Sequence, residues 1–96
     1  MLFLSRLFLI LIASAAALPA QKIRIGLIGL DTSHVIAFTS LLNEENNPLH
    51  VPGAIVTAAY KGGSPDIPSS INRVPGFTKT LTEKYGVRLY VNIAEM

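Results

Sequence analysis

The sequence predicts an α/β fold built on a parallel sheet whose strands are connected by helices. Three short apolar runs, at residues 23–30, 54–60 and 87–91, have the length and composition of buried strands. Segments with apolar residues at helical spacing lie between them. Such alternation is typical of a parallel sheet with right-handed crossovers. The chain has 96 residues, which is room for one small domain.

Residues 1–20 have the pattern of a secretory signal peptide. A short, weakly basic start that ends at Arg6 is followed by an apolar run and then by small residues up to Ala20. The run, Leu7–Leu18, is about 12 residues long, whereas a membrane-spanning helix needs about 20. We therefore expect a secreted or periplasmic protein with no stable membrane association after cleavage. The alternative is a protein anchored in the membrane by an uncleaved N-terminal segment.

The expected domain, residues 21–96, begins with the strand IRIGLIGL at positions 23–30. Its near-continuous apolar pattern predicts burial on both faces. The next three residues, Asp31-Thr32-Ser33, offer helix N-cap chemistry. A helix over residues 34–42 then follows from apolar residues at helical spacing: Val35, Phe38 and Leu42.

The second half of the domain is also predicted to contain a strand, a helix and a further strand, with a long irregular segment before the helix. After the strand at 54–60 comes a stretch rich in glycine, proline and serine, Lys61–Gly76, which is expected to be a loop. It either wraps a ligand or lies on the surface. A helix is predicted at Phe77–Tyr85, where a glycine ends it. The third strand, 87–91, precedes Asn92, which could cap a further helix.

Composition excludes several classes of partner and site. Without Arg6, the seven remaining basic residues nearly balance six acidic ones, and they form no cluster, so a nucleic-acid partner is not expected. Cysteine is absent, so no disulfide framework supports the domain. The spacing of His34, His50 and Asp66 matches no known pattern of metal ligands.

The turn after the first strand is the candidate binding site. In a Rossmann domain the pyrophosphate of a dinucleotide lies at this turn, against the N–H groups that begin the helix, and the fingerprint is G-x-G-x-x-G. The turn here reads Gly29-Leu30-Asp31-Thr32-Ser33-His34, so only the first glycine is present. Asp31 adds bulk and a negative charge at the second place. His34 stands at the third, where it must point aside or line the crevice.

A second departure concerns the end of the second strand. Rossmann domains place an acidic residue there to bind the ribose hydroxyls. This chain has Tyr60-Lys61 at that position. Lys61 either favours the 2′-phosphate of NADP or is simply solvated.

Three segments together resemble a known family. KIRIGLIGLDTSH, GAIVTAAY and FTKTLTEKYGVRLYVNIAEM are similar to the N-terminal domain of the Gfo/Idh/MocA oxidoreductases. The resemblance covers about residues 22–96. It implies a Rossmann-like sheet, of which these residues hold the first three strands, that binds NAD or NADP. It also implies a second domain, beyond these residues, that holds a sugar or cyclitol-like substrate.

The resemblance assigns cofactor contacts but no catalytic residue to this chain. The implied contacts are Gly29, Leu30, Asp31, Thr32, Ser33 and His34 at the turn, with Lys61 at the usual acid position. The family's catalytic residues lie in segments that follow those matched here. We therefore expect an N-terminal part of an NAD(P)-dependent oxidoreductase, with a homo-oligomer left open. The alternative is a secreted binding or structural domain that has lost NAD(P) binding, because Asp31, His34 and Lys61 all depart from the pattern.

Overall fold

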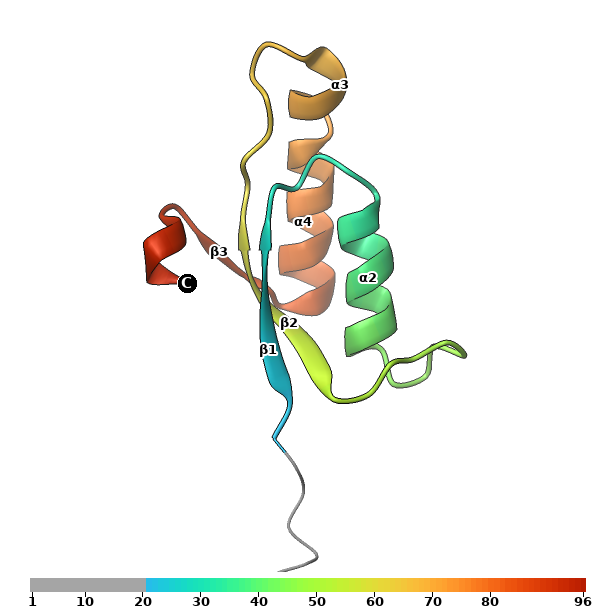
Figure 1. Cartoon of the computed structure of the whole chain (residues 1–96). Coiled ribbons are helices and arrows are strands. Elements are labelled where there is room, and N and C mark those ends of the chain that lie inside the picture. The colour runs from blue at the N-terminus through green and yellow to red at the C-terminus, as the bar shows by residue number, and fades with distance from the viewer. Residues whose placement is uncertain (1–20) are drawn as a thin grey trace, which may run out of the picture.

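A computed structural model describes residues 21–96 and contains a three-stranded parallel sheet with helices between its strands (Figure 1). This confirms the predicted α/β class. The predicted signal peptide lies outside the described residues. Within residues 21–96, no helix has the length and apolar character needed to cross a membrane. The elements are β1 (Ile23–Ile28), α2 (His34–Asn43), β2 (Ala54–Tyr60), α3 (Pro68–Ile71), α4 (Val74–Tyr85), β3 (Arg88–Tyr90) and the 3-10 turn η1 (Ile93–Glu95).

The strands lie in the sheet in the order β1-β2-β3, and both neighbouring pairs are parallel. Gly26 pairs with Ala58, which pairs with Arg88, so these residues form one row across the sheet. The register shifts by one residue between Ile25 and Gly26, and Thr57 is the extra residue on β2. Such a bulge bends the strand and re-aims its side chains.

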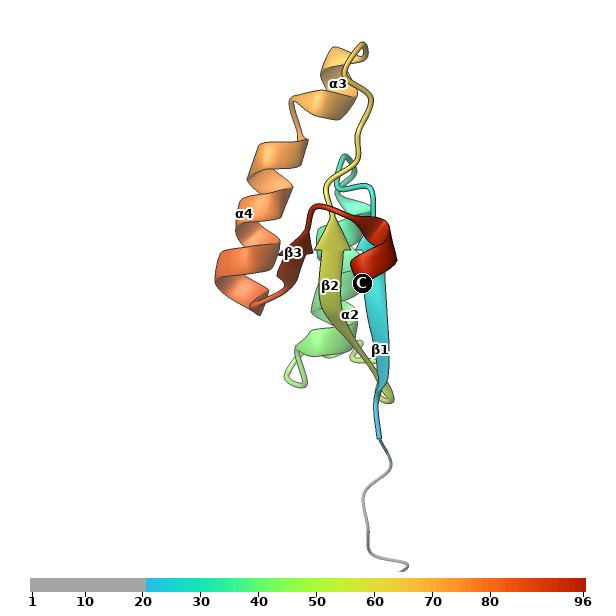
Figure 2. The ribbon, with the colours of Figure 1, turned by 90° about the vertical axis from the view of Figure 1, so that its left-hand side faces the viewer.

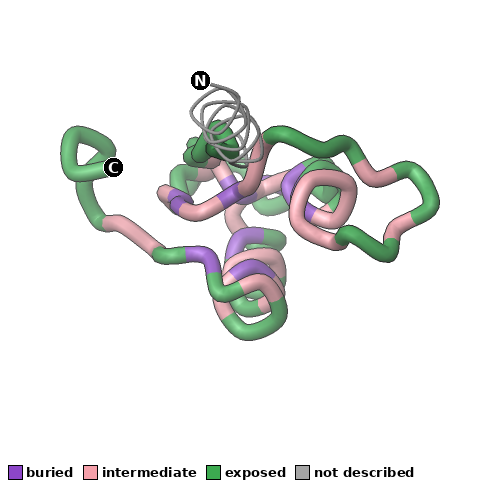
Figure 3. Tube along the Cα trace, turned by 90° about the horizontal axis from the view of Figure 1, so that it is seen from below, coloured by how far each residue is buried: buried purple, intermediate pink, exposed green. Residues whose placement is uncertain are grey.

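Helices α2 and α4 cover one face of the sheet, and η1 lies on the other (Figures 1 and 2). The buried residues gather where the sheet meets the two helices (Figure 3). On the covered face, Leu27, Ala59 and Leu89 belong to this core or pack against it. The largest fully buried apolar side chains are Leu30 and Leu81. The core therefore sits between one sheet face and one helix layer.

The prediction that the first strand is buried on both faces is wrong. Ile28 is 62 % exposed, and Arg24 and Gly26 on the same strand are also exposed. Of the described elements, only η1 lies against this second face (Figure 2). The apolar run shows that the strand is hydrophobic, but it does not show which elements cover each of its two faces.

The segment predicted to be a loop is shorter than expected. It contains the one-turn helix α3, and α4 begins at Val74 rather than at Phe77. Both helices have a proline in the first turn, where the missing N–H has no partner to lose. The predicted capping role of Asn92 is confirmed, because its side-chain oxygen accepts a hydrogen bond from the Ala94 N–H at 2.9 Å.

Side chains at the end of α2 fasten this helix to its neighbours. The Asn43 amide donates to the Val56 carbonyl at 3.0 Å and accepts from the Val56 N–H at 2.8 Å. Next to it, the Glu44 carboxylate accepts a hydrogen bond from Ser40 and lies 3.6 Å from the Lys84 ammonium of α4. The Ser40 hydroxyl and then the Lys84 charge hold the pKa of Glu44 below its ordinary value. The Glu44 charge in turn raises the pKa of Lys84.

Candidate functional site

The carboxyl ends of β1 and β2 bring two glycine turns into direct contact. Gly29 has φ +91° and Gly62 has φ +56°, which are conformations that favour glycine. A Cβ on Gly62 would lie 3.1 Å from the Gly29 Cα, so a side chain there would require the Gly29 backbone to move by a few tenths of an ångström. The Gly29 and Leu30 N–H groups donate to the carbonyls of Tyr60 and Lys61, at 3.0 and 2.8 Å. Hydrogen bonds between the two segments thus extend beyond the paired strands into both turns.

These contacts change the role of two predicted site residues. The N–H groups of Gly29 and Leu30 are already bonded to β2, so they are not free to bind a ligand. The Leu30 side chain is fully buried in the core. Gly29 shapes the turn, and Leu30 anchors it. The contacts left for a ligand at this turn therefore come from residues 31–34.

Asp31 is directed toward the loop that follows β2. One carboxylate oxygen accepts a hydrogen bond from the Ser70 hydroxyl at 2.7 Å, and that hydroxyl oxygen accepts one from the Ser64 N–H at 2.8 Å. The other carboxylate oxygen lies 4.0 Å from the position that a Cβ would take on Gly29. Asp31 therefore does not cap α2. It joins the first turn to the second loop, and its charge remains above Gly29.

The start of α2 is capped weakly. The Thr32 hydroxyl oxygen lies 3.4 Å from the His34 N–H and 2.9 Å from the His34 Nδ1 atom. Ser33 occupies the N-cap position, and its side chain makes no capping hydrogen bond. Within residues 21–96, the backbone N–H groups of residues 31–33 have no hydrogen-bond acceptor. They remain available to an anion, together with the positive end of the helix dipole.

The ring of His34 is exposed and contacts both the Thr32 hydroxyl in the turn and the Phe38 ring on the helix. It stacks on Phe38, with 6.0 Å between the ring centroids and 25° between the planes. His34 therefore borders the turn without closing it.

A pocket of about 430 Å³ lies beyond the carboxyl ends of β2 and β3. Lys61 is exposed at its rim, and no acidic residue lines it. The pocket brings the predicted residue Lys61 beside the end of β3, which sequence reasoning did not include in the site. Its lining consists of Tyr60, Lys61, Gly62, Gly63, Pro65, Leu89, Tyr90 and Val91.

Sequence reasoning also missed Ser64 and Ser70 as partners of the turn. The glycine- and serine-rich composition of the loop was a signal that it could surround a ligand, but composition does not specify a pairing partner. The structure places Ser70, which is buried, against Asp31 across 39 residues of sequence. Within the described part of the chain, no group of three or more His, Cys, Asp or Glu residues could hold a metal ion.

The Lys61 pocket and the β1–α2 turn differ in how well they suit the adenosine and the pyrophosphate of a dinucleotide. Lys61 and the apolar, aromatic wall of the pocket suit an adenosine that carries a 2′-phosphate. The free N–H groups at residues 31–33 suit a pyrophosphate, whereas the Asp31 carboxylate above Gly29 opposes one. No protein-family model matches the sequence, and no curated protein or solved structure matches it either.

Proposed function

We propose that residues 21–96 form a Rossmann-like nucleotide-binding domain, and that the chain is the NAD(P)-binding part of a Gfo/Idh/MocA-like oxidoreductase acting on a sugar or cyclitol-like substrate. One observation carries the proposal. The Gly29 turn, the start of α2 and the Lys61 pocket meet at the carboxyl edge of a parallel sheet. Ligands of open α/β sheets bind in the crevice at this edge.

Two separate groups of the described residues would bind the two parts of the ligand. The N–H groups of residues 31–33 and the α2 dipole would hold the pyrophosphate. The adenosine would lie in the pocket between the Gly62-Gly63 turn and the end of β3. Lys61 would pair with a 2′-phosphate, and there is no carboxylate at this place to bind free ribose hydroxyls. The proposed cofactor is therefore NADP in preference to NAD.

Nucleotide titration of the full chain tests the proposal. We expect NADP to bind at least about tenfold more tightly than NAD, since one charge-assisted contact distinguishes them. Lys61→Gln should abolish this preference. Lys79→Gln removes the same charge from an exposed position on α4 and should leave it unchanged. Equal binding of the two cofactors by the unaltered chain would contradict the role given to Lys61.

The position of Asp31 favours a second candidate function, a binding or structural domain that has lost NAD(P). The Asp31 carboxylate lies next to Gly29 and is held there by the hydrogen bond from Ser70. A pyrophosphate bound at this turn would be repelled by its negative charge. This candidate predicts that neither NADP nor NAD binds at millimolar concentration. It also predicts that Asp31→Gly restores binding, because the substitution removes both the bulk and the charge. Tight NADP binding by the unaltered chain would exclude it.

The proposed location and activity have separate tests. Export predicts that the secreted or periplasmic product begins at Gln21, which N-terminal sequencing of the mature protein determines. A product that retains Met1 would support the membrane-anchored alternative. The activity part rests on the family resemblance, which places the catalytic residues outside residues 22–96. An assay of NADP reduction with a panel of sugars and cyclitols tests it on the full-length protein.

A further inference from the structure

The Gly62-Gly63 turn that follows β2 is held at both ends by residues of the β1–α2 turn. At its start, the Leu30 N–H donates to the Lys61 carbonyl at 2.8 Å. At its end, the Ser64 N–H donates to the Ser70 hydroxyl at 2.8 Å. That hydroxyl in turn donates to the Asp31 carboxylate at 2.7 Å. Two neighbouring residues of one turn therefore fix both ends of the other.

The middle of this turn has no anchor of its own. Gly62 and Gly63 carry no side chain, and both have positive φ angles, +56° and +89°. Glycine adopts many backbone conformations with similar energy, so these two residues do not select the shape of the turn themselves. Among residues 21–96, their N–H groups have no hydrogen-bond acceptor. The turn therefore needs contacts from other segments to keep one shape.

The same two glycines line the Lys61 pocket and offer it two hydrogen-bond donors. A phosphate group has several acceptor oxygens, and proteins bind such groups with a lysine together with backbone N–H groups. The 2′-phosphate that is assigned to Lys61 therefore has three candidate donors on one short turn. They are the Lys61 ammonium and the N–H groups of Gly62 and Gly63.

We infer that Asp31 is a positioning residue of this phosphate site, although it does not touch the phosphate. Its carboxylate orients the Ser70 hydroxyl, and the Ser70 oxygen fixes the Ser64 N–H. This contact keeps Gly62 and Gly63 in the shape that binds a 2′-phosphate. The inference rests on the proposed function, because it concerns the same nucleotide. Asp31, which stands at the second glycine place of the fingerprint, thus contributes to the selection of NADP over NAD.

Two effects of Asp31 on nucleotide binding can be separated. Its negative charge repels the pyrophosphate, which NADP and NAD share, so this effect lowers both affinities by the same factor. Its hydrogen bond with Ser70 acts on the 2′-phosphate, which only NADP carries. The ratio of the two affinities therefore measures the positioning role. A loss of stability leaves this ratio unchanged, because partial unfolding reduces the binding of both cofactors in proportion.

Calorimetric titration of the full chain with NADP and with NAD tests the inference. In Ser70→Ala we expect the preference for NADP to fall about threefold or more, because the Ser64 N–H loses its acceptor. Asp31→Ala should lower the preference to a similar extent, even where it raises the affinity for both cofactors. Ser69→Ala, at the exposed neighbouring position, is the control and should keep the preference.

Asp31→Asn separates the hydrogen bond from the charge. Asparagine keeps an oxygen that accepts from the Ser70 hydroxyl, but it carries no charge. We expect the affinities for NADP and NAD to rise by a similar factor in this variant, with the preference for NADP retained. A preference lost equally in Asp31→Asn and Asp31→Ala would overturn the inference, because it would assign the effect to the charge.

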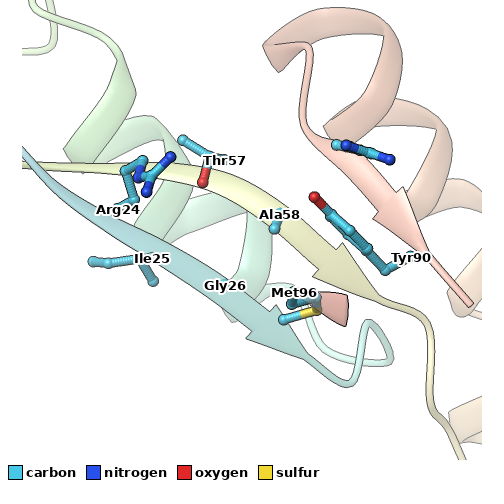
Figure 4. A pocket seen from close by; sticks show the side chains of 8 residues that line it. Arg24, Ile25, Gly26, Thr57, Ala58, Tyr90 and Met96 are labelled. Carbon is cyan, nitrogen blue, oxygen red and sulfur yellow. The ribbon is translucent and has the colours of Figure 1, made fainter. Parts of the chain in front are cut away.

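A second hollow provides a control for general attraction of the phosphate. It lies on the sheet face opposite the helices, is lined by Arg24 and Arg88 among others, and shares only Tyr90 with the Lys61 pocket (Figure 4). Arg24→Gln removes a positive charge from this hollow and should leave the preference for NADP unchanged. A fall in preference equal to that in Ser70→Ala would contradict the placement of the 2′-phosphate at the Gly62-Gly63 turn.

A spectroscopic readout locates the phosphate. In ¹H–¹⁵N spectra, adenosine 2′,5′-bisphosphate should shift the Gly62 and Gly63 amide signals further than adenosine 5′-monophosphate does, because only the first probe carries the 2′-phosphate. In Ser70→Ala the difference between the two probes should become smaller. Equal shifts with both probes in the unaltered chain would overturn the role given to these N–H groups.

The titrations also distinguish this inference from the proposed function. Absence of a preference for NADP in the unaltered chain would overturn both, because there would be no 2′-phosphate site to position. A preference that Lys61→Gln abolishes but that Ser70→Ala and Asp31→Ala both keep would overturn this inference alone. In that case Lys61 would bind the phosphate without help from the Asp31 contact.

Discussion

The carboxylate of Asp31 accepts a hydrogen bond from the hydroxyl of Ser70, at 2.7 Å and across 39 residues of sequence. The same hydroxyl oxygen accepts a hydrogen bond from the Ser64 N–H, so one buried serine on α3 connects the β1–α2 turn with the loop between β2 and α3. A partly buried carboxylate needs such a donor. This contact therefore positions both turns of the candidate site.

We predict that Ser70→Ala destabilises the protein by about 1–2 kcal/mol, because it leaves the Asp31 carboxylate and the Ser64 N–H without their partner. Asp31→Asn should also be destabilising, and the double variant should lose less than the sum of the two, by about 0.5 kcal/mol or more. Urea unfolding of the four proteins measures this coupling. Ser69→Ala, at the exposed neighbouring position, is the control and should be close to neutral. Strictly additive losses would show that the contact contributes nothing.

Gly62→Ala should cost more stability than Gly86→Ala. The two glycines have similar φ angles, +56° and +64°, so alanine is strained at both by about 1 kcal/mol. Only at Gly62 would the new Cβ also lie 3.1 Å from the Gly29 Cα, whereas Gly86 faces open space. We expect an additional loss of about 1 kcal/mol at Gly62 from this overpacking. Chemical denaturation gives the difference, and equal losses would mean that the two turns separate easily.

Asn43→Asp should release β2 from the end of α2. The substitution keeps the shape of the side chain but removes the donor to the Val56 carbonyl and places a carboxylate beside it. We expect a loss of about 1–3 kcal/mol and faster hydrogen exchange of the Val56 amide. Asn46→Asp introduces the same charge at an exposed position and serves as the control. Unchanged exchange at Val56 in Asn43→Asp would contradict this role.

The Glu44 contacts predict a dependence on acidic pH. The pKa of Glu44 is held below its ordinary value of 4.5 by Ser40 and Lys84, so at acidic pH the unfolded chain binds more protons than the folded protein. The stabilising contribution is thus fully present above the unfolded-state pKa and is lost as the pH falls through the lower folded-state pKa.

Ser40→Ala should raise the pKa of Glu44 toward its ordinary value, because the Ser40 hydroxyl is the largest cause of the shift. An NMR titration of the Glu44 carboxyl carbon measures the change. The control variant Ser69→Ala should leave the titration curve unchanged. A Glu44 titration that is the same in Ser40→Ala as in the unaltered protein would assign the shift to Lys84 instead.

The regular elements could be predicted where the sequence carries a local signal. The bounds of β2 match the expected strand, since Gly53 and Lys61 flank a short apolar run. The predicted start of α4 lies three residues after the observed start at Val74, because the prolines and glycines before Phe77 favour a loop, although proline is acceptable in a first helical turn.

Contacts between distant segments could not be predicted in the same way. The residues next to Asp31 in the sequence do not indicate that its hydrogen-bond partner is Ser70. The residue types at the turn likewise do not indicate that the Gly29 and Leu30 N–H groups donate to the carbonyls of Tyr60 and Lys61. The exposure of one face of β1 could not be predicted for a similar reason. An apolar run in the sequence is equally hydrophobic whether or not other elements cover it. The turn residues from Gly29 to His34 and Lys61 can be singled out in the sequence because they directly follow the ends of two predicted strands, and their role as cofactor contacts stays a prediction.

Each strand of the sheet lies beside the strand that comes before it in the sequence. Among the three described strands, none has to be inserted between two that are already paired, so β2 can pair with β1 and β3 with β2 in the order of the sequence. The pairing of β1 with β2 needs no residue beyond Tyr60, and β3 then adds to a formed template. Pairing of sequence neighbours keeps the contact order low for a parallel sheet, which favours rapid folding and a short exposure of unpaired strand edges.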